Sequence, residues 1–104
     1  MSLDEGVYFD RLFVEYSPLL TEKKRELFEM YFRLDLSLSE IAEINGVTRQ
    51  SVLDGIASVK KQLSDYESKL GYLKKKNEVY ALIDRLSDEN ASVGEQIKKV
   101  LGEG

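Results

Sequence analysis

A run of four polar residues could contact a nucleic acid: Thr48, Arg49, Gln50 and Ser51. Arginine can pair two donors with a guanine edge, and glutamine can pair with an adenine. Serine and threonine hydroxyls at a helix N-terminus can bind a phosphate. Lys60 and Lys61 follow further along the chain, where they could touch the phosphate backbone. These residues are therefore candidates for nucleic-acid binding, provided that an exposed helix positions them.

The flanking residues predict such a helix. Ser37 and Glu40 have the spacing of a capping box, which opens a helix, and Gly46 allows that helix to end. Thr48 can cap the next helix, and Ala42 is small enough for two helices to cross there. The stretch 37–56 is therefore predicted to form a helix-turn-helix, whose second helix presents its first residues outward.

Apolar residues at helical spacing predict what these helices bury. Ile41, Ala42 and Ile44 are predicted to form the buried side of the first helix, and Val47 to fill the gap under the turn. The second helix carries a heptad stripe of Val52, Ile56, Val59, Leu63, Tyr66 and Leu70. It is predicted to run from Arg49 to Leu70 and to stop at Gly71. Its second half needs a partner, either the C-terminal helices of the same chain or the same helix of a second copy.

Helical spacing also dominates the rest of the chain. A first helix is predicted to stop at Ser17-Pro18, and Thr21 is predicted to cap a second helix. Apolar faces over 79–86 and 93–101 predict two more, the last opened by a capping box at Ser92 and Glu95. The fold class is therefore all-α. We expect one helical domain over 1–104, with a helix-turn-helix core at 19–61 and a long-helix extension with C-terminal helices at 62–104.

The composition argues against several classes of function. The 104 residues include no cysteine and no histidine, which removes the usual zinc ligands and the usual nucleophile and base pairs. We therefore expect no enzyme activity, no cofactor and no metal. No apolar run approaches the roughly 18 residues of a membrane span, and no secretory signal is evident. The expected location is the cytoplasm, without membrane insertion.

The charge balance weighs against strong nucleic-acid binding. The chain has 15 basic and 19 acidic residues, a net charge of −4, and the helix-turn-helix has no basic excess. The alternative is a protein-interaction surface, which would combine acidic residues of the first helix with apolar residues of the long one: Glu40, Glu43, Leu63, Tyr66 and Leu70. The lysine run Lys74 to Lys76 is either a solvated face or an accessory contact with RNA or phosphate.

Residues 19–70 resemble a known family. The segments "LSLSEIAE", "GVTRQSV" and "DYESKL" are similar to the YlxM family of small bacterial proteins and, more distantly, to region 4 of sigma factors. This resemblance implies a sigma-like helix-turn-helix, a regulatory role in the signal recognition particle pathway, and DNA or RNA and the particle's components as partners. The segment "LDGIASVKK" departs from the family, because Ala57 and Ser58 stand near where basic residues are common. A helix-turn-helix reader of DNA usually works as a dimer, so we also expect a homodimer.

Overall fold

The computed structural model describes residues 3–102, and in that range it has six α-helices and no strand. The helices are α1 (Leu3–Tyr16), α2 (Glu22–Phe28), α3 (Leu38–Asn45), α4 (Arg49–Leu70), α5 (Tyr72–Ile83) and α6 (Ala91–Val100). Three shorter helical segments are η1 (Ser17–Leu19), η2 (Glu29–Arg33) and η3 (Asp88–Asn90). The prediction of an all-α fold is confirmed.

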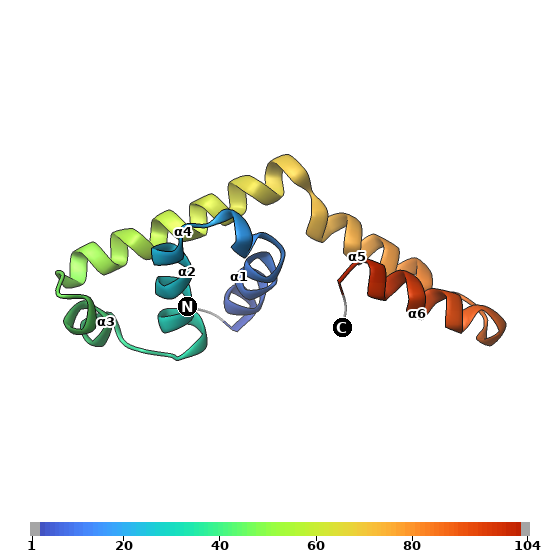
Figure 1. The fold of residues 1–104 in the computed structure, drawn as a ribbon, viewed down its shortest axis with the longest axis horizontal. Helices are drawn as coiled ribbons and strands as arrows, with labels where there is room; N and C mark the ends of the chain where they lie inside the picture. Colours follow the sequence, from blue (N-terminus) through green and yellow to red (C-terminus); the bar gives the residue numbers. More distant parts are fainter. Residues whose placement is uncertain (1–2, 103–104) are drawn as a thin grey trace. The chain divides into compact units, whose positions relative to one another are not determined.

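The chain divides into two compact units, residues 1–70 and residues 71–104, and the expectation of one helical domain over 1–104 stays a prediction. In unit 1 the long helix α4 is the common support, and α1, α2 and α3 all pack along one side of it (Figure 1). Within the described residues, no helix is both long and apolar enough to cross a bilayer.

The heptad stripe of α4 faces the interior of unit 1. Four residues of the stripe are buried: Val52, Ile56, Val59 and Leu63. Tyr66 lies at the edge of this core, with its ring centroid 5.8 Å from that of Tyr16 in α1. Within unit 1 this part of the stripe already has a partner that the heptad spacing does not indicate, because α1 packs against α4. The buried part of the stripe is also not free to pair two long helices.

Aromatic rings join α1 to α2 and η2. Phe13 stacks on Phe28 at a centroid distance of 4.2 Å, and Phe28 stacks on Phe32 at 4.4 Å. Arg33 closes this cluster, since its guanidinium lies over the Phe13 ring and pairs with Asp10 at 2.9 Å. Such offset ring pairs contribute beyond the area that they bury. They hold α1 and α2 together beneath α4.

The predicted helix ends in unit 1 are mostly confirmed. The first helix ends at Tyr16, directly before Ser17-Pro18, and the Thr21 hydroxyl accepts a hydrogen bond from the Lys24 amide. The prediction that Ile44 is buried is wrong, because its side chain is 61% exposed. The reason is that α3 packs on α4 and η2 through the side carrying Ile41 and Ala42, which leaves Ile44 outside that contact.

Unit 2 is an antiparallel hairpin of α5 and α6 (Figure 1). Gly94 allows the two helices to approach, since a Cβ there would lie 2.7 Å from Cγ2 of Ile83. The predicted capping box at Ser92 and Glu95 is absent. Because η3 runs directly into α6, the helix already begins at Ala91, and Ser92 lies inside it.

Candidate nucleic-acid interface

The helix-turn-helix is built by local hydrogen bonds that the sequence predicts. The Ser37 hydroxyl accepts from the Glu40 amide at 3.0 Å, and the Glu40 carboxylate accepts from the Ser37 amide at 3.1 Å. Gly46 ends α3 in the left-handed conformation, with φ 65°. The Val47 amide then donates to the Ala42 carbonyl at 3.0 Å, which closes the turn. These contacts fix the point from which α4 starts.

The first turn of α4 presents Thr48, Arg49, Gln50 and Ser51, all exposed. The Thr48 hydroxyl oxygen caps the helix by accepting from the Ser51 amide at 3.0 Å. Arg49 has no ion pair within residues 3–102. Gln50 differs, because its side-chain amide donates to the Asp54 carboxylate at 2.9 Å. Arg49 is therefore the available cation, whereas Gln50 must leave Asp54 before it can read a base.

The two lysines further along α4 are both engaged. Lys60 pairs with Glu5 of α1, and its amine lies 5.1 Å from the centroid of the Phe9 ring. The hydrogen bond from Lys60 to the Glu5 carboxylate lowers the pKa of the Glu5 carboxyl below its ordinary value, whereas desolvation raises this pKa by a smaller amount. Lys61 pairs with Asp65 at 3.0 Å, one turn along the helix. Lys60 thus belongs to the contact between α1 and α4, and the charge of Lys61 is largely balanced.

The structure also adds a residue that is not among the candidates from the sequence. Leu53 stands one helical turn after Arg49, outside the heptad stripe, and is 45% exposed. An apolar side chain at the start of a reading helix can contact the methyl group of thymine. Its position off the stripe, so close to Arg49, is the signal that could have identified it.

The candidate protein-interaction residues do not form one surface. Glu40 and Glu43 are exposed on α3, beside the start of α4, and Glu40 is held in its capping box. Leu63 is fully buried, and the Tyr66 hydroxyl donates to the Leu19 carbonyl at 3.2 Å. Leu70 is 39% exposed at the far end of α4. The acidic members therefore lie beside the start of α4, whereas the apolar members lie along its second half, about 21 to 32 Å from Arg49 at 1.5 Å per residue.

The lysine run begins α5 in unit 2. The amine of Lys76 lies 5.9 Å from the centroid of the Tyr80 ring, and its side chain is partly buried. Lys74 and Lys75 are exposed. Lys98 of α6 lies over the same ring, at 5.8 Å, so cations of both helices surround Tyr80. Part of the run is therefore used in packing the hairpin.

Comparison with known proteins identifies the family. Residues 3–102 match UPF0122, described as "Putative helix-turn-helix protein, YlxM / p13 like". The chain belongs to this family. The match includes both units, so the hairpin of α5 and α6 is as much part of the family as the helix-turn-helix.

Individual relatives support the same family assignment. The UPF0122 protein of Fusobacterium nucleatum is 47% identical over 89 residues, which cover 85% of this chain and 86% of the relative. A relative from Clostridium perfringens is 42% identical over 91 residues, covering 85% of this chain and 81% of its own length. The one from Clostridium acetobutylicum is 35% identical over 109 residues and covers 93% of this chain and 94% of its own length. The resemblance to YlxM proteins is therefore confirmed.

Proposed function

We propose that this UPF0122 protein is a cytoplasmic regulator that binds DNA or RNA through the first turn of α4. The observation that carries the proposal is Arg49, which is exposed at the N-terminal end of α4 and has no ion-pair partner within the described residues. A helix N-terminus attracts anions, so an arginine beside it suits a phosphate or a guanine edge. Thr48 can still donate its hydroxyl hydrogen to a phosphate while its oxygen caps the helix.

The arrangement of charges around the first turn of α4 predicts a moderate affinity for nucleic acid. Lys60 and Lys61 are paired with Glu5 and Asp65, and Asp54 places a negative charge beside Gln50. Few phosphates would therefore be neutralised. Neutralising two phosphates of duplex DNA would give a slope of about −2 when the logarithm of the binding constant is plotted against the logarithm of the salt concentration. The resemblance to YlxM proteins suggests the signal recognition particle pathway as the setting, with the particle's RNA as one candidate ligand.

The test is a binding titration with the full chain and Arg49→Ala. Fluorescence anisotropy would be measured with duplex DNA and with the particle's RNA at low and at physiological salt. Since Arg49 is the available cation of the first turn, its removal should cost about 1–3 kcal/mol of binding free energy and reduce the salt slope by about 1.

Arg85→Ala is the matched control, because it removes one exposed arginine from unit 2 and leaves the helix-turn-helix unchanged. Its affinity should stay close to that of the unaltered chain. Binding that is undetectable at low salt for both nucleic acids, or equally weakened by both substitutions, would contradict the proposal.

A second candidate function is protein interaction, and the exposed apolar residues of unit 2 favour it. Leu82 is 61% exposed on α5, and Val93 and Val100 of α6 are 52% and 87% exposed. Large apolar side chains exposed on a small unit can mark a contact with another protein. The partners that we propose are the components of the signal recognition particle and a second copy of this chain, which would make a homodimer.

Two measurements examine this second candidate. Light scattering at high protein concentration should give the mass of a dimer if two copies pair, and a monomer would remove that proposal. A pull-down with the GTPase protein of the particle should recover a complex if that partner is correct. Replacing Leu82 with serine should weaken whichever complex forms, while Leu34→Ser, at a residue that is 66% exposed in unit 1, should not.

A further inference from the structure

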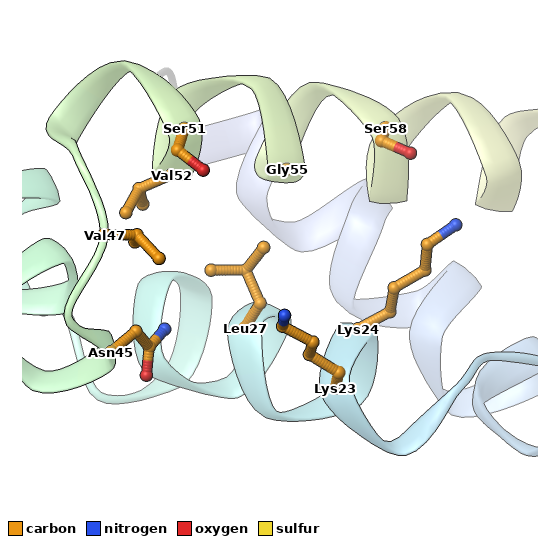
Figure 2. Close-up of a pocket in the computed structure, with 9 residues that line it drawn as sticks. All are labelled: Lys23, Lys24, Leu27, Asn45, Val47, Ser51, Val52, Gly55 and Ser58. Atoms are coloured by element: carbon orange, nitrogen blue, oxygen red, sulfur yellow. The ribbon is translucent and has the colours of Figure 1, made fainter.

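A pocket of about 290 Å³ lies in unit 1 between α2 and the N-terminal half of α4 (Figure 2). On the side that borders the pocket, α4 carries three small residues, Ser51, Gly55 and Ser58. Gly55 lets α2 and α4 approach closely, since a Cβ there would lie 2.8 Å from Cδ2 of Leu27, and the pocket lies beside this contact. Val47 was predicted to fill the space under the turn, but it is 42% exposed and lines the pocket instead. The prediction for Val47 is therefore wrong, because its side chain borders an open pocket and does not close it.

The interior of the pocket is apolar and its rim is cationic. Leu27, Val47 and Val52 contribute the apolar wall. Lys23 and Lys24 reach the rim from α2, and Figure 2 shows Lys24 extending toward Ser58 of α4. None of the residues that line the pocket is acidic.

The two lysines differ in how far they are engaged. The amine of Lys24 donates to Oε1 of Gln62 at 2.5 Å, so part of its hydrogen-bonding capacity is used. Lys23 is exposed and has no ion pair within residues 3–102. The Ser51 and Ser58 hydroxyls offer further donors on the opposite side. A single anionic group at the rim could therefore meet one free ammonium group and a hydroxyl.

We propose that this pocket binds a small organic acid, with the carboxylate at Lys23 and a short apolar tail against Leu27, Val47 and Val52. The volume lies just below the roughly 300–1,000 Å³ that drug-sized ligands occupy, which limits the tail to a few carbons. A carboxylate suits the rim, because a hydrogen bond between an ammonium group and a carboxylate is stronger than one between neutral groups. The site goes beyond the proposed function, since it would bind its ligand without nucleic acid.

Hexanoate is the probe, and hexanol is its neutral counterpart with the same tail. The isotope-labelled full chain would be titrated with each and followed by amide NMR. We expect hexanoate to bind with a dissociation constant of about 1 mM or tighter. The chemical-shift changes should be concentrated at Val47, Ser51, Val52 and Gly55. Hexanol should bind at least about fivefold more weakly, because it lacks the charge for Lys23.

Two variants and one control complete the test. Lys23→Glu should weaken hexanoate binding by at least about fivefold, and Lys75→Glu, with the same charge change in unit 2, should leave it unchanged. Ser58→Leu should abolish binding by filling the rim while the circular dichroism spectrum stays the same. Three results would each overturn the proposal. They are the absence of chemical-shift changes with hexanoate, binding of hexanol as tight as that of hexanoate, and unchanged hexanoate binding by Lys23→Glu. None of these readouts uses nucleic acid, so they are independent of the test of Arg49.

Discussion

Two glycines stand where helices approach closely, and their neighbours differ in the freedom to move. Opposite Gly55 lies the end of the Leu27 side chain, which borders an open pocket. Gly94 faces Ile83, and Cδ1 of Leu86 would lie 3.2 Å from an added Cβ on the other side. Isoleucine in a helix is held to one main rotamer, whereas leucine can turn its terminal methyl groups into an adjacent space. The same substitution should therefore have opposite effects at the two positions.

We predict that Gly55→Ala is neutral or stabilising and that Gly94→Ala is destabilising. An alanine gains about 1 kcal/mol of helix stability relative to glycine, and at Gly55 Leu27 can yield into the pocket. At Gly94 overpacking against Ile83 should cost about 1–3 kcal/mol and outweigh that gain. Amide hydrogen exchange would measure each effect locally, in α4 and in α6. Faster exchange of the α4 amides in Gly55→Ala than in the unaltered chain, or slower exchange of the α6 amides in Gly94→Ala, would contradict this account.

The charged residues show what the sequence could and could not predict at this scale. The pairs of Gln50 with Asp54 and of Lys61 with Asp65 follow from positions four apart on one helix. Both pairs could have been predicted from the sequence alone. The pairing of Lys60 with Glu5 joins residues 55 positions apart, and nothing in the spacing indicates it. It depends on how α1 packs against α4, which local pattern does not contain.

At the scale of elements, that same pair links the start of α1 to the middle of α4. The hydrogen bond from Lys60 lowers the pKa of the Glu5 carboxyl below its ordinary value of 4.5. A lowered pKa means that the unfolded chain binds the proton more readily than the folded chain does. The pair therefore stabilises unit 1 above pH about 4.5, and that stabilisation is lost as the pH falls through the lowered pKa.

We predict that Glu5→Gln flattens the acid side of the stability profile. Between pH about 5 and about 3, the melting temperature of the unaltered chain should fall more steeply than that of the variant. Melting curves followed by circular dichroism at a series of pH values would measure the difference. Glu22→Gln, at an exposed carboxylate of α2, is the control and should keep the original slope. Parallel curves for Glu5→Gln and the unaltered chain would show that the pair contributes nothing.

Helix ends were predictable where a single side chain or glycine decides them. Thr21, Ser37, Gly46 and Thr48 all act as the sequence predicts, because a cap depends on residues within one turn. The start of α6 was not predictable in this way, since η3 extends the helix backward past Ser92. Exposure of Ile44 was missed for a related reason: the pattern gives a helix face but not the width of its contact.

At the scale of the whole molecule, the two units differ in how much they bury. Unit 1 contains several fully buried large side chains, among them Leu12, Phe28, Ile41 and Leu63. In the described part of unit 2, only Leu73 and Gly94 are buried. The spacing of apolar residues over 79–86 and 93–101 predicted two amphipathic helices. This spacing cannot show whether the apolar faces of the two helices cover each other. In the hairpin they leave Leu82, Val93 and Val100 exposed.

We predict that a chain ending at Leu70 folds by itself, whereas a peptide of residues 71–104 does not. Unit 1 has its own core, but a chain of fewer than about 40 residues usually needs a disulfide, a metal or a partner to fold. Thermal melting followed by circular dichroism should show a cooperative transition for the first and little helix for the second at low concentration. A cooperative, concentration-independent melt of the peptide would contradict the prediction. Helix content that rises with peptide concentration would instead mean that a second copy supplies the missing core, because association shifts folding by mass action.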